Sequence, residues 1–75
     1  MTLYDFELLK DGAVIEAARS IALPDLAAAW PLIAAIARTI QESGCKIRVK
    51  DEVGGIVILT GVASARRYAG GGIAA

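Results

Sequence analysis

Histidine is absent from this 75-residue chain, and cysteine occurs once, at Cys45. Without histidine, the Ser-His and Cys-His pairs that commonly activate a nucleophile cannot form. One cysteine provides neither an intrachain disulfide nor a tetrahedral zinc site, and we interpret Cys45 as a small hydrophobic side chain. We therefore predict a protein that is not an enzyme, with no catalytic residue, metal ligand or cofactor.

Net charge is also missing, because eight Lys and Arg residues balance eight Asp and Glu residues. The chain therefore lacks the long-range field that concentrates nucleic acid or an anionic membrane at a protein surface. The longest uncharged apolar run extends only from Leu26 to Ala37, whereas a membrane-spanning helix needs about 20 residues. Acidic residues near the start stand where a signal peptide has basic ones, so we expect a cytoplasmic protein.

The length allows one domain. Chains this short bury only roughly 60% of their unfolded surface, and a single core rarely supplies more than about 3–5 kcal/mol. Natural proteins of this size add disulfides, a metal or a second subunit. With the first two excluded, oligomerisation is the stabilising device that remains.

The first half of the chain predicts a β-hairpin. Residues 3–9 alternate with a period of two, which places apolar Tyr4, Phe6 and Leu8 on one face of a strand and acidic Asp5 and Glu7 on the other. Asp11-Gly12 favours a two-residue type I′ turn, after which residues 13–17 form the return strand. In that register Glu7 would lie opposite Glu16, a repulsive pair unless basic groups lie nearby. Residues 18–22 are expected to form a connector.

One long helix is predicted for residues 25–43. Asp25 is a good N-cap after Pro24, and the helix would end before Gly44. A single apolar stripe runs at intervals of three and four residues: Leu26, Ala29, Trp30, Ile33, Ile36, Ala37 and Ile40. Pro31 interrupts the pattern. We favour one helix kinked near residues 27–31, with two segments separated by a break as the alternative.

Two more strands follow. Residues 45–51 alternate again, with Lys46, Arg48 and Lys50 on the polar face. A turn at residues 51–55 leads to a strand at residues 56–60 that has no polar face. The last part contains three consecutive glycines, so we predict a domain of residues 1–62 and a flexible tail of residues 63–75.

These elements predict an α+β fold in the order ββαββ. A right-handed crossover gives a four-stranded antiparallel sheet of order 2-1-3-4, covered on one face by the helix. This order brings the basic stripe beside the acids Asp5, Glu7 and Glu16. The expected sheet side of the core comprises Tyr4, Phe6, Leu8, Ile15, Ala17, Ile47, Val49 and Ile58.

Several short motifs resemble a family of small bacterial domains of unknown function, found mainly in alphaproteobacteria. The motifs read Y-x-F, D-G, L-P-D and D-E-x-G, and here they are Tyr4-Asp5-Phe6, Asp11-Gly12, Leu23-Pro24-Asp25 and Asp51-Glu52-Val53-Gly54. The resemblance covers about residues 4–60. The helix departs from the family pattern, because it is nearly apolar and contains Pro31, and the acidic, glycine-containing loop before L-P-D is missing. The resemblance implies no activity.

Self-association is the function that these observations favour. A fully apolar strand at a sheet edge needs a cover, so we predict a homodimer or a complex with another protein through Ile56, Val57, Ile58 and Leu59. The alanine-rich back of the helix is the second choice. A nucleic-acid-binding accessory protein is the alternative, with Lys46, Arg48 and Lys50 contacting phosphates, although the aromatic platforms typical of single-strand binders point to the core.

Three other features are interpreted as structural. Asp51 and Glu52 lie in a turn and supply too few oxygens for calcium. Gly54-Gly55 precedes a strand, so no helix N-terminus is available to bind phosphate there. The glycines at positions 70–72 have no surrounding structure that would form a phosphate loop.

Overall fold

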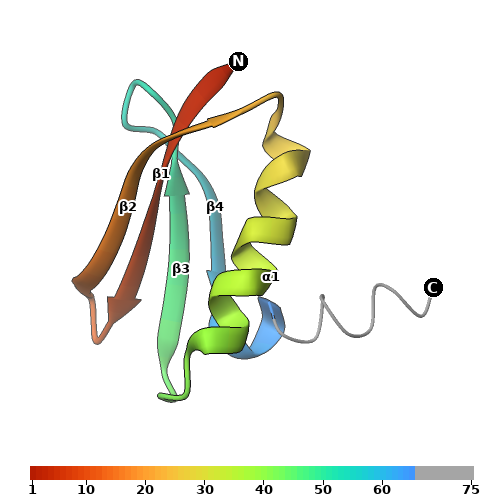
Figure 1. Ribbon diagram of the computed structural model, residues 1–75. Helices are drawn as coiled ribbons and strands as arrows, with labels where there is room; N and C mark the ends of the chain where they lie inside the picture. Colours follow the sequence, from red (N-terminus) through yellow and green to blue (C-terminus); the bar gives the residue numbers. More distant parts are fainter. Residues whose placement is uncertain (66–75) are drawn as a thin grey trace.

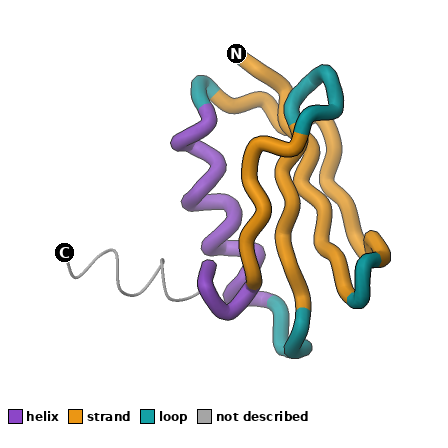
Figure 2. The backbone as a smooth tube through the Cα atoms, turned by 180° about the vertical axis from the view of Figure 1, so that it is seen from behind, coloured by secondary structure: helices purple, strands orange, loops and turns teal. Residues whose placement is uncertain are grey.

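The computed structural model describes residues 1–65, which form one antiparallel sheet and one helix (Figure 1). The strands are β1 (Thr2–Lys10), β2 (Ala13–Leu23), β3 (Cys45–Lys50) and β4 (Ile56–Gly61), and the helix α1 (Ala29–Thr39) follows a 3-10 turn at Leu26–Ala28. The strand order is β2-β1-β3-β4, as predicted. Figures 1 and 2 show α1 against one face of the sheet, and nothing within residues 1–65 covers the opposite face.

The hairpin turn forms as predicted, with positive φ angles of 53° at Asp11 and 79° at Gly12. The register beyond it differs from the prediction. Leu9 lies opposite Val14, but Leu8 lies opposite Glu16, because β2 contains one extra residue in a β-bulge at Ile15. The bulge reverses which face of the sheet each following residue occupies. The predicted Glu7–Glu16 pair is therefore wrong, since Glu7 lies opposite Ala17.

A second irregularity lets β2 run through the predicted connector. Tyr4 pairs with Ile21 and Phe6 with Ala18, so β2 again has one residue more than β1. Ser20 adopts a left-handed φ of 58°, and its backbone N–H donates to Asp5 Oδ1 at 2.9 Å. This hydrogen bond satisfies a donor that the bulge removes from the regular ladder. The expectation of a connector at residues 18–22 is wrong because Asp5 holds the bulge in place.

The helical region starts where predicted, but it is neither one α-helix nor two segments separated by a break, because a 3-10 turn runs directly into the α-helix. The Asp25 side chain accepts the Ala28 N–H at 3.0 Å and caps the 3-10 turn. The α-helix begins only at Ala29, which places Pro31 in its first turn, where a missing N–H is tolerated. The helix ends at Thr39 rather than at residue 43. Ile40 is extended, with ψ of 120°, and packs against the core.

The core lies between α1 and the sheet. Six predicted members are buried, namely Tyr4, Phe6, Leu8, Ile47, Val49 and Ile58. Ile15 and Ala17 were predicted incorrectly, because the bulge leaves Ile15 47% exposed and places Ala17 on the outer face with Glu7. Leu26, from the predicted helical stripe, is also exposed. On α1 the buried positions are Ala29, Ile33, Ala34 and Ala37, so the stripe is centred on alanines.

The packed domain extends beyond the predicted boundary at residue 62. Residues 62–65 are helical, and both Val62 and Ala65 are buried in the core cluster. The predicted tail of residues 63–75 therefore begins too early. The rest of that tail, residues 66–75, lies outside the described residues.

Candidate interaction surfaces

The uncovered face of the sheet is built around one buried carboxylate. Glu7 is only 4% exposed, although it lies on the face opposite α1. Arg48 Nε donates to Glu7 Oε1 at 2.7 Å, Lys50 Nζ lies 3.6 Å from the same oxygen, and an Arg19 guanidinium nitrogen lies 3.6 Å from Oε2. Arg19 also contacts Asp5 Oδ2 at 3.4 Å. Three strands thus contribute to one ion-pair cluster, which we call the Glu7 cluster: Asp5, Glu7, Arg19, Arg48 and Lys50.

The surroundings of Glu7 keep it ionised. Burial raises the pKa of a carboxyl group, but the hydrogen bond from Arg48 and the charges of Arg48, Lys50 and Arg19 together outweigh it, so the pKa of Glu7 is lowered from its ordinary value of 4.5. The cluster therefore holds a charged side chain at the centre of a face that also exposes Leu3, Ile56 and Leu59.

The predicted basic stripe is largely engaged within the protein. Arg48 and Lys50 both contact Glu7, whereas Lys46 is exposed and makes no ion pair among residues 1–65. Glu16 was expected to share in this neutralisation but lies on the helix side. Arg19, which the sequence reasoning missed, joins Arg48 and Lys50 as a third cation around Glu7. No sequence signal would have located Arg19, because its position depends on the two bulges.

The two edges of the sheet differ in how they are protected. β2 carries Glu16 and Arg19 and contains both bulges, and such features discourage the pairing of an edge with another strand. β4 has no charged residue, and its single irregularity lies at Val57. Within the described residues no strand lies beyond β4. β4, which the sequence predicts to be the interaction strand, is thus the less protected edge of the sheet.

The four predicted interface residues do not share one environment. Ile56 and Leu59 are 55% and 57% exposed, while Ile58 is buried against the helix side. Val57, the extra residue at the irregularity, is half-buried and packs against the core. The exposed part of the predicted interface therefore consists of Ile56 and Leu59.

The remaining candidates have structural positions. Cys45 is buried and unpaired. Asp51 Oδ1 accepts the N–H groups of Val53 and Gly55 at 3.1 and 2.8 Å, which forms the turn between β3 and β4, and Glu52 accepts the Leu3 N–H at 2.8 Å. No group of three His, Cys, Asp or Glu side chains in residues 1–65 is arranged to hold a metal ion. The glycines at positions 70–72, which were not expected to form a phosphate loop, lie outside the described part.

The helices of the described part are all too short or too polar to cross a membrane. Comparison with protein-family models, with curated proteins and with solved structures found no match to this chain. The resemblance to the small bacterial domains therefore stays a prediction. Functional inference rests on the surfaces themselves.

Proposed function

We propose that this chain is a non-enzymatic protein-binding module that forms a homodimer through the free edge of β4. The observation that carries the proposal is Leu59, which is 57% exposed on an edge strand without a charged residue. Antiparallel pairing of two β4 strands about a two-fold axis would join two sheets and satisfy the free backbone groups of both edges. The same pairing would cover Leu59 in both copies.

A second copy is the occupant that fits this edge best. The chain has no net charge, so two copies approach without long-range repulsion. A domain of this size gains stability from a partner subunit, and identical edges pair in register without further matching. We place the dimer in the cytoplasm, where a lone buried thiol such as Cys45 stays reduced.

The test is the oligomeric state of the purified chain at micromolar concentration. Light scattering should give twice the 7.8 kDa mass of one chain. Leu59→Lys should weaken the dimer about 100-fold. Leu59 is 57% exposed in one chain, so each copy loses about 1.5 kcal/mol of apolar burial, which amounts to about 3 kcal/mol per dimer.

The matched control is Val14→Lys, which changes an exposed apolar residue on the other edge strand. It should leave the dimer intact. A monomer at all concentrations, or equal effects of the two substitutions, would contradict the proposal.

Nucleic-acid binding through Lys46, Arg48 and Lys50 remains the alternative. It receives less support, because Glu7 contacts two of these three side chains. A low-salt gel-shift assay with single- and double-stranded oligonucleotides decides it. Binding that falls steeply with salt would favour the alternative, and the absence of a shift would remove it.

A further inference from the structure

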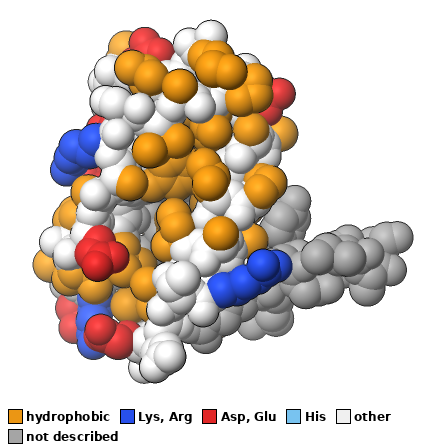
Figure 3. Space-filling model, in the orientation of Figure 1, with side chains coloured by type: hydrophobic (Ala, Val, Ile, Leu, Met, Phe, Trp, Pro, Cys, Tyr) orange, Lys and Arg blue, Asp and Glu red, His pale blue; other side chains and the backbone are white. Residues whose placement is uncertain are grey.

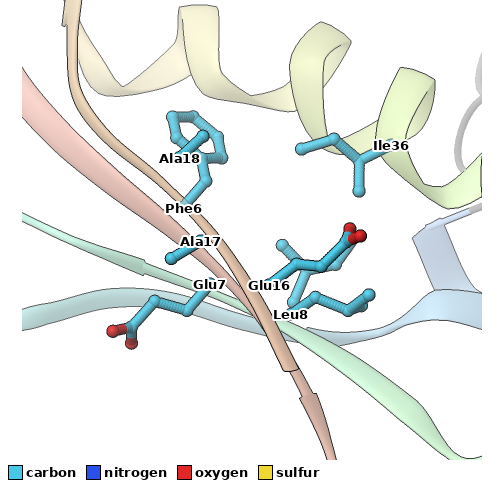
Figure 4. Close-up of a pocket in the computed structure, with 8 residues that line it drawn as sticks. Phe6, Glu7, Leu8, Glu16, Ala17, Ala18 and Ile36 are labelled. Carbon is cyan, nitrogen blue, oxygen red and sulfur yellow. The ribbon is translucent and has the colours of Figure 1, made fainter. Parts of the chain in front are cut away.

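A groove runs between α1 and the β1–β2 hairpin, on the opposite side of the sheet from the Glu7 cluster. It has a volume of about 460 Å³, within the range of small-molecule sites. Its apolar floor and wall come from Phe6, Leu8, Ile47 and Ile36 (Figure 4). Figure 3 shows hydrophobic side chains gathered over the space between α1 and β2. A second hollow of about 430 Å³ continues the groove and shares Leu8 and Glu16 with it.

Glu16 is the charged side chain that points into this groove. In Figure 4 its carboxylate extends toward Ile36 on α1, whereas Glu7 points to the other side of the sheet. The bulge at Ile15 causes this orientation. Regular pairing would place Glu16 on the outer face, but the extra residue at Ile15 carries it to the helix side, where Ile15 and Glu16 both border the second hollow. Bulges re-aim side chains next to functional sites, and a local departure from the apolar-inside pattern is a mark of such sites.

Glu16 also differs from most of the other acidic residues in having no hydrogen-bond or ion-pair partner among the described residues. All eight lie within residues 1–65, and six have a hydrogen-bond or ion-pair partner: Asp5, Glu7, Asp25, Glu42, Asp51 and Glu52. The other two, Asp11 and Glu16, make no such contact within the described part. Asp11 lies in an exposed turn. Glu16 is therefore the unpaired carboxylate that borders an apolar surface.

We propose that the groove binds a small organic cation with an apolar body, such as an aryl-alkyl or alkyl ammonium compound. The ammonium group would pair with Glu16, and the apolar body would lie between Ala18 and Ile36, over the edges of Phe6 and Leu8, which are 3% and 6% exposed. The side chains that line the groove in Figure 4 include no hydrogen-bond donor, so an anionic ligand would find no side-chain partner. Ala18, opposite Phe6 in the ladder, leaves the entrance open because it is small.

A small molecule fits this groove better than an extended peptide. A peptide would have to add a strand to β2, and the two bulges interrupt the regular row of backbone groups that strand addition requires. The proposed dimer edge, β4, is at the other end of the sheet. Ligand binding here and self-association there are therefore independent.

The experiment uses three matched probes on the full chain: 4-phenylbutylammonium, 4-phenylbutan-1-ol and 4-phenylbutyrate. Titrations followed by two-dimensional NMR should show saturable shifts at Phe6, Leu8, Ala18 and Ile36 with the ammonium compound. The alcohol should bind about tenfold more weakly, because it lacks the charge-assisted hydrogen bond, and the carboxylate should not bind. Equal shifts with all three probes would overturn the proposal.

Two substitutions locate the site. Glu16→Gln should weaken the ammonium compound about tenfold and remove its advantage over the alcohol, while Asp11→Asn, the matched loss of the other unpaired carboxylate, should not. Ala18→Leu should block all binding, and Ala22→Leu, an exposed position farther along the same strand that does not line the groove, should not. If Glu16→Gln and Ala18→Leu change the oligomeric mass instead of ammonium binding, the groove is a protein interface and the proposal fails.

Discussion

Replacing Glu7 by Gln removes the negative charge that holds the uncovered sheet face together. Glu7 is 4% exposed and lies within 3.6 Å of three cationic groups on three different side chains. In the variant, Arg19, Arg48 and Lys50 would remain close together with Asp5 as the single acidic neighbour. Because glutamine has nearly the same shape, the substitution changes charge while packing is kept.

The cost follows from the contacts. The charge-assisted hydrogen bond from Arg48 at 2.7 Å contributes about 1.5–3 kcal/mol. The contacts of Lys50 and Arg19 add only a few tenths of a kcal/mol each, since these side chains keep 30% and 59% of their exposure. The glutamine side chain still offers Arg48 a neutral acceptor, so part of the hydrogen bond is kept. The free energy of unfolding should therefore fall by about 2 kcal/mol. That is a large share of the roughly 3–5 kcal/mol available to a core of this size.

The pH dependence has a definite sign. The pKa of Glu7 is lower in the folded protein than the ordinary value of 4.5, so its charge stabilises the fold above that value. The stabilisation is lost as the pH falls below 4.5 and through the folded-state pKa. The difference between the native chain and Glu7→Gln should therefore be largest near neutral pH and should shrink in acid.

Urea unfolding followed by circular dichroism measures the loss, and thermal melts should show a decrease of roughly 10 °C. Glu16→Gln is the control, because it makes the same chemical change on an exposed side chain and should alter stability by less than about 0.5 kcal/mol. An equal effect of the two variants at neutral pH, or a difference that grows in acid, would refute the role assigned to the Glu7 cluster.

Two further predictions concern the helix. Asp25→Ala removes the side-chain acceptor of the Ala28 N–H and should lower the free energy of unfolding by about 1 kcal/mol in urea titrations; no change would show that the cap is dispensable. Pro31→Ala should change it by less than about 1 kcal/mol, because Pro31 lies in the first turn of α1. A gain near 3 kcal/mol would instead mean that Pro31 interrupts a continuous helix.

Some of the fold could be predicted because local signals agreed with one another. Alternation placed Tyr4, Phe6 and Leu8 on the buried face, and Asp11-Gly12 set the turn. The strand order was correct, but the argument from charge was only partly right. The basic stripe does neutralise Glu7, whereas Glu16, which the stripe was also expected to neutralise, lies on the other side of the sheet.

The errors share one physical cause. Prediction from alternating residues assumes that each residue of a strand has one partner on the neighbouring strand. β2 departs from this twice, because at each bulge it has one residue more than β1. A single extra residue moves every following side chain to the other face. Glu16 and Ala17 were therefore assigned to the wrong side, Ile15 was wrongly assigned to the core, and the groove with its carboxylate could not be foreseen. The sequence contains no glycine at either bulge that would have signalled it.

The sequence by itself determined the element order, the capped start of the helix and the apolar character of the last strand, because these depend on neighbours along the chain. Only the tertiary structure decided which residues share a face of β2, because a bulge forms when contacts distant in the sequence compensate for the lost pairing. Asp5 supplies that compensation for Ser20 from another strand. The burial of Glu7 likewise depends on Arg19 and Arg48, which are brought together from either side of β1.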